Sequence, residues 1–139
     1  MIRAALLAAV LAAAGSAMAA SWDPDLTWRS LKTEHFTITF HEGEEQLAEE
    51  LAETAERIWV VLTEDMHNAP KRPVEIVLVD HTDQANGYAT TLPVNTIVIY
   101  VTAPREDSTL GLYDDWLEAI TTHELAHILH LDTVEGIPK

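Results

Sequence analysis

The segment from Asp115 to Leu131 constrains the fold most, because it predicts a helix that is apolar around most of its circumference. Asp115 followed three residues later by Glu118 resembles a capping box, which marks the start of this helix. A helix that is apolar on most sides is expected to be buried in a core. Its apolar residues are Trp116, Leu117, Ile120, Leu125, Ile128 and Leu129.

The same helix carries an HExxH motif, formed by His123, Glu124 and His127. Residues four apart on a helix differ by about 40° in direction and about 6 Å in height, so both imidazoles can reach one ion at the roughly 2.0–2.1 Å that zinc requires. Glu124 points about 100° away from His123 and therefore lies beside the ion, where it can take a proton from a bound water and pass it on. Burying these polar groups costs free energy, and a metal ion is the usual compensation. The motif therefore predicts a zinc centre with a glutamate base.

Two alternatives stay open around this motif. His123 and His127 can instead be core histidines that are hydrogen-bonded to the backbone. His130 lies two helical turns after His123 and can be a further ligand, a group that faces the substrate, or packing at the helix end. The pattern of metzincins fails, because His130 stands where that pattern has Gly and Thr133 where it has its last His.

The rest of the chain predicts an α+β fold with a small sheet, a long helix and the HExxH helix. The long helix is acidic along much of its length, and we expect these acidic residues to form a solvated face. Residues 22–31 are interpreted as an entry segment, and 86–91 as a sheet edge beside the two motif histidines. Expected strands cover 34–41, 73–80 (in the interior, covered on both faces), 88–91 and 96–102, and the long helix covers 42–66.

The first 19 residues are typical of a signal peptide. Arg3 precedes an apolar run over 4–14, and Ala17-Met18-Ala19 matches a cleavage site. The run is too short to span a membrane, so we expect a periplasmic or secreted bacterial protein without a membrane span after cleavage. Loss of Arg3 changes the net charge of −15 to −16, which disfavours nucleic acids and anionic membranes as partners. The chain has no cysteine, so neither disulfides nor thiol catalysis is expected.

Residues 115–132 resemble the active-site helix of gluzincins, specifically the bacterial peptidase-MA-like group. Residues 83–89 and 95–100 are similar to the strand pair that precedes that helix. The resemblance implies a zincin-like N-terminal subdomain within a metallopeptidase domain over 20–139, with Zn²⁺ as cofactor and a peptide or protein as substrate. Members often precede a TolB-like or WD40-like β-propeller, so it also implies a propeller as partner.

The family pattern further implies a third zinc ligand, a Glu on a later helix. Glu135 superficially matches, but it follows His127 by only eight residues, too few to turn back on a second helix. We therefore expect a truncated chain whose C-terminal subdomain is missing and whose HExxH helix keeps uncovered apolar sides. Two functions remain: zinc-dependent peptide hydrolysis with Glu124 as general base, or a catalytically incomplete binding module that serves a propeller or envelope partner.

Overall fold

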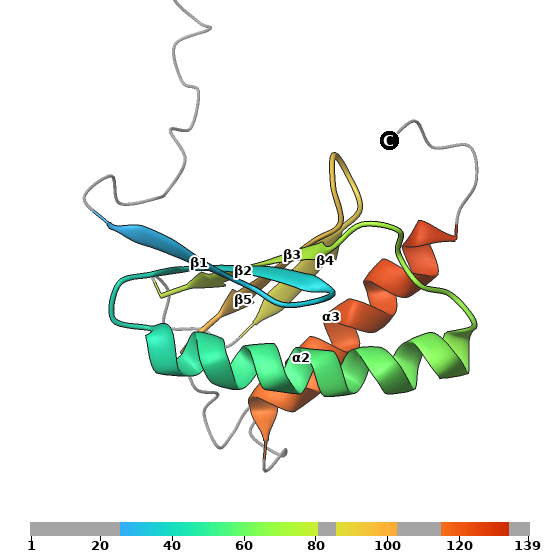
Figure 1. The fold of residues 1–139 in the computed structure, drawn as a ribbon, viewed down its shortest axis with the longest axis horizontal. Helices are drawn as coiled ribbons and strands as arrows, with labels where there is room; N and C mark the ends of the chain where they lie inside the picture. Colours follow the sequence, from blue (N-terminus) through green and yellow to red (C-terminus); the bar gives the residue numbers. More distant parts are fainter. Residues whose placement is uncertain (1–25, 81–85, 103–114, 134–139) are drawn as a thin grey trace, which may run out of the picture.

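The computed structural model describes residues 26–80, 86–102 and 115–133 (Figure 1). Strands and helices alternate irregularly along the chain, as the sequence predicted for an α+β protein. The elements are β1 (Trp28–Lys32), β2 (Phe36–His41), α2 (Glu45–Met66), β3 (Val74–Val79), β4 (Gly87–Thr90), β5 (Thr96–Tyr100) and α3 (Trp116–Asp132). None of the helices described is long and apolar enough to cross a membrane, and the predicted signal peptide lies outside these residues.

The five strands form one mixed sheet in the order β1-β2-β3-β5-β4. β2, β3 and β5 run parallel, while β1 and β4 pair antiparallel at the two ends. β3 is central, as its nearly continuous apolar sequence predicted. Parallel neighbours need a crossover, and α2 makes the one from β2 to β3.

Both helices pack against the same face of the sheet and against each other (Figure 1). The registers bring Ile38, Ile76 and Ile97 of the three parallel strands into one row on that face. On the other face, the Val77 side chain of β3 is half-buried, whereas Val79 of β3 and Val98 of β5 are only 2% and 4% exposed. The expectation that β3 is covered on both faces is therefore met only in part within the described residues, because both helices lie on one face and the other face is buried at Val79 but not at Val77. The remaining core positions are Phe36, Phe40, Ala48, Leu51, Ala52, Ala55, Ile58, Trp59, Val74, Leu78, Ile99, Leu117, Ile120, Leu125, Ile128 and Leu129.

Two boundaries differ from those that the sequence predicted. The interpretation of 22–31 as an entry segment missed β1, whose residues show no alternation because the strand lies at the sheet edge and is largely exposed. α2 begins at Glu45 rather than at residue 42, because Gly43 adopts a positive φ of 106° that interrupts the helix. At the other end, His67 has a left-handed backbone directly after Met66, which ends α2 where the sequence predicted.

Candidate metal centre

The HExxH motif lies in α3, which begins with a capping bond of the expected kind. The Oδ1 atom of Asp115 accepts a hydrogen bond of 2.9 Å from the backbone N–H of Glu118. This bond satisfies one of the free N–H groups at the helix start. The predicted capping residue is confirmed, and it marks the start of the helix that carries the motif.

Contacts at both ends of α3 and with the sheet hold this helix in place. Near its start, the Arg57 guanidinium of α2 lies 3.4 Å from the Glu118 carboxylate. Near its end, the Asn68 side chain donates a hydrogen bond of 2.7 Å to the Leu129 carbonyl. On the sheet side, Gly87 of β4 approaches Ile120 so closely that a Cβ at Gly87 would lie 3.1 Å from the Ile120 Cγ1 atom. These contacts orient the motif against α2 and β4.

His123 and His127 project from the same side of α3, and their Nε2 atoms lie 3.0 Å apart. The two rings are nearly perpendicular, with centroids 4.6 Å apart. Two ligand nitrogens held about 2.0–2.1 Å from one tetrahedral zinc ion lie about 3.3–3.4 Å apart. The observed pair needs only a small movement to reach that spacing, so the donor set fits a shared zinc ion.

The burial of the motif differs from what the sequence predicted. His123 and His127 are exposed, and only Glu124 is buried, with 5% of its surface exposed. The argument that a metal ion compensates for burying the two imidazoles is therefore wrong, because these imidazoles are exposed. The alternative that they are core histidines is also wrong, because α3 buries its apolar side and leaves this pair on its open side.

No third ligand joins the pair within the described residues. Neither Glu124 nor the exposed His130 forms a cluster with both imidazoles in which all ligand atoms lie within 4.8 Å of one another. Glu135 lies outside the described residues. The structure therefore supplies two of the three protein ligands that catalytic zinc sites normally use.

The edge strand β4 borders α3, as expected for residues 86–91. β4 pairs only with β5 among the described strands, and it packs against α3. Gly87 of β4 approaches Ile120, which precedes His123 by three positions and His127 by seven, so all three lie on neighbouring sides of the helix. The sheet edge thus borders the helix that carries the histidine pair.

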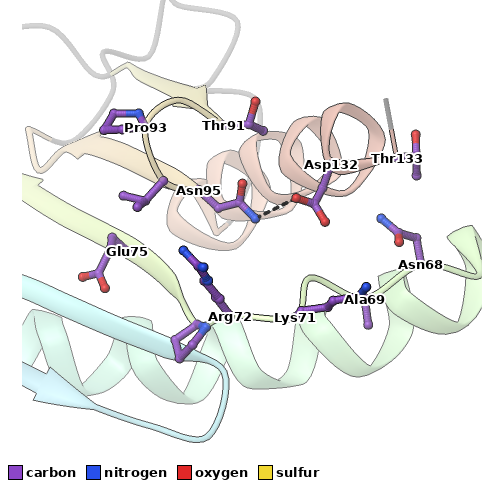
Figure 2. A pocket seen from close by; sticks show the side chains of 12 residues that line it. Asn68, Ala69, Lys71, Arg72, Glu75, Thr91, Pro93, Asn95, Asp132 and Thr133 are labelled. Atoms are coloured by element: carbon purple, nitrogen blue, oxygen red, sulfur yellow. Dashed lines mark hydrogen bonds between the residues drawn. The ribbon is translucent and has the colours of Figure 1, made fainter. Parts of the chain in front are cut away.

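A cavity of about 830 Å³ lies at a different place (Figure 2). It is lined by residues after α2, by the β4–β5 connection and by the end of α3, where Asn95 donates a hydrogen bond of 3.2 Å to Asp132. Lys71 and Arg72 contribute positive charge. Its lining includes neither motif histidine nor Glu124, so we do not assign it to the metal centre.

Comparison with known proteins adds the family. The family model described as Peptidase family M48 matches residues 45–138, which includes α2, the sheet strands β3 to β5 and the whole motif. No curated protein matches the chain. The match agrees with the metallopeptidase chemistry that the histidine pair suggested.

Proposed function

The chain belongs to peptidase family M48, a family of metal-dependent peptidases, and on this premise we propose that it hydrolyses peptide bonds with a zinc ion bound by His123 and His127. The observation that carries the proposal is the 3.0 Å spacing of the two Nε2 atoms on the open side of α3. An exposed pair of imidazoles leaves room for an ion, a water and a substrate carbonyl.

Glu124 is the proposed general base. It is the one acidic residue of the motif, and it is buried beside the histidine pair rather than solvated. A bound zinc ion supplies Lewis acidity and lowers the pKa of a coordinated water. Glu124 accepts the proton of the attacking water at a carboxylate oxygen and delivers it to the leaving amine nitrogen.

The substrate is proposed to bind along β4. An edge strand with free backbone groups can bind an extended peptide by strand addition, and β4 packs against the helix that carries the histidine pair. Tyr88 on this strand is 49% exposed and is available for contact with such a peptide.

We place the third ligand, a glutamate as in gluzincins, outside the described residues. The signal-like residues 1–19 support a periplasmic or secreted location, and a C-terminal propeller is a proposed partner.

A second candidate function is a binding module that resembles a peptidase but lacks turnover. It is favoured by one observation, the absence of a third ligand among the described residues. The buried Glu124 favours the peptidase, because a docking platform has no use for a proton acceptor at this place.

The experiment that tests the proposal uses the full-length protein and a library of quenched fluorescent peptides. We expect hydrolysis that a chelator abolishes and that added zinc restores. Hydrolysis that persists under chelation, or specific peptide binding without any cleavage in the presence of zinc, contradicts the proposal, and the second outcome favours the binding module.

A further inference from the structure

A second cluster of metal-binding side chains lies at the sheet edge where β2 and β3 end. His41 is the last residue of β2, Asp80 directly follows β3, and Glu44 is the N-cap residue of α2. Because β2 and β3 are parallel neighbours, their carboxyl ends meet at the same edge. None of the three residues belongs to α3, so the cluster is distinct from the histidine pair.

The cluster is compact. The His41 Nε2 atom lies 3.3 Å from Glu44 Oε1 and 3.9 Å from Asp80 Oδ2. One ligand atom from each of the three residues can be chosen so that all lie within 4.8 Å of one another. Ligands on a tetrahedral zinc ion are separated by about 3.3–3.5 Å, so only small rotations of the side chains separate this arrangement from a zinc site.

The imidazole of His41 is held in the orientation that a ligand needs. Its Nδ1 atom lies 3.0 Å from the backbone carbonyl oxygen of Glu42, and a carbonyl only accepts, so Nδ1 carries the proton and donates. Trp28 packs edge-on against the ring, with centroids 6.2 Å apart. Nε2 therefore faces the two carboxylates. Metal-binding histidines commonly donate their other ring N–H to a backbone carbonyl in this way.

One of the two carboxylate oxygens of Glu44 is buried without a hydrogen-bond partner. This oxygen is Oε2, and the Glu44 side chain as a whole is only 10% exposed. By contrast, Glu56, which also pairs with a histidine, has both oxygens bonded, to the N–H and the ring of His35. A buried carboxylate oxygen without a donor is costly unless a cation engages it.

The neighbouring positive charge is directed elsewhere. Arg29 contacts Glu42 and Glu45, the exposed acidic residues just before and just after Glu44 in the turn that leads into α2. Within the described residues, no ion pair joins Arg29 to Glu44 or Asp80. A divalent cation neutralises both carboxylates and can engage all three side chains.

We propose that His41, Glu44 and Asp80 form a second metal site that binds a zinc-class divalent cation. An imidazole nitrogen with carboxylate oxygens is a donor set that zinc accepts, whereas Mg²⁺ and Ca²⁺ prefer oxygen ligands alone. The bound ion ties the ends of β2 and β3 to the start of α2. It is a structural site, separate from the centre on α3.

The test removes the centre on α3 first. In the full-length protein with His123→Ala and His127→Ala, about one zinc per chain should remain, and cobalt in its place should show an absorption spectrum typical of tetrahedral coordination. Zinc should also raise the melting temperature of this double variant. Adding Glu44→Gln or Asp80→Asn should weaken zinc binding at least about tenfold and remove that stabilisation. Glu45→Gln is the matched control and should keep both.

Two results overturn the proposal: a folded double variant that binds no zinc, or equal zinc affinity after Glu44→Gln and Asp80→Asn. If a ligand variant fails to fold, the ¹⁵N shift of His41 Nε2 in the double variant decides, since zinc should move it strongly and an unchanged shift rejects the site. If this second site is rejected, the proposed zinc centre on α3 still stands. That centre is tested separately, by the zinc lost on His123→Ala and His127→Ala.

Discussion

The Nε2 atoms of His123 and His127 lie 3.0 Å apart on the exposed side of α3, while Glu124 between them is buried. Helix geometry accounts for both facts. The two histidines are four residues apart and share a side, and Glu124 is rotated by about 100° from His123 towards the packed side. One turn of helix thus presents two ligands to solvent and keeps a carboxylate in the protein beside them.

The first prediction is that these two histidines hold zinc. His123→Ala together with His127→Ala should lower the zinc content of the full-length protein by about one ion per chain, because two ligands of one site are removed. His130→Ala is the control, since His130 does not join the pair in the described structure, and it should keep the zinc. Metal analysis by mass spectrometry measures both. An unchanged zinc content in the double variant contradicts the assignment, and a loss on His130→Ala makes His130 a ligand.

The second prediction concerns acid stability and the pair Glu56–His35. Burial tends to raise the pKa of Glu56, but hydrogen bonds from His35 and Thr33, together with the charge of His35, lower it below its ordinary value of 4.5. Because the folded-state pKa lies below that of the unfolded chain, the stabilisation is complete above pH 4.5 and is lost as the pH falls through the folded-state pKa.

Glu56→Gln should therefore lower the free energy of unfolding at pH 7 by about 1–2 kcal/mol, because the amide cannot serve both donors of His35 as a carboxylate does. The difference from the parent should shrink towards zero in acid. Urea unfolding at several pH values measures this. Glu53→Gln, at an exposed position of the same helix, should have almost no effect. An equal loss at every pH would show that the charge of Glu56 is not responsible.

The third prediction tests the close contact between β4 and α3. A Cβ at Gly87 would lie 3.0 Å from the backbone oxygen of Val98 and 3.1 Å from Ile120 Cγ1. Gly87→Ala should therefore cost about 1–3 kcal/mol of stability through overpacking. Ile120→Ala removes one of the two obstacles, so the double variant should lose less than the sum of the single losses. Strict additivity in a double-mutant cycle contradicts the contact.

Much of the fold could be predicted from apolar periodicity, and the failures have physical causes. β3 and β5 are apolar runs, and α3 carries both a cap and an apolar face, so these elements were located to within one or two residues. β1 was missed because an exposed edge strand has no buried side to reveal it. The start of α2 was placed too early because the acidic residues around Gly43 are typical of a helix start, whereas the positive φ of Gly43 delays the helix.

The candidate site was predicted by residue but not by environment. Apolar residues spread around much of α3 do not reveal which side of the helix is packed, so the exposure of His123 and His127 came only from the structure. The expected uncovered apolar sides of α3 reduce, within the described residues, to Leu131 near its end, because Leu117, Ile120 and Leu125 are buried by the sheet and α2. The more exposed apolar residues lie on α2, at Val60 and Val61. Glu44, expected to be part of a solvated face, is almost fully buried because the chain turns there beside His41.

The measurement that tests the account most directly is peptide hydrolysis by the Glu124→Gln variant of the full-length protein, with its zinc content determined on the same sample. Glutamine matches the size of glutamate but cannot accept the proton of the attacking water. We predict an unchanged zinc content and a turnover number reduced by about 10²–10⁴-fold. A variant that keeps its zinc and cleaves peptides at the parent rate would contradict the account, because the buried carboxylate beside the histidine pair would then have no part in the reaction.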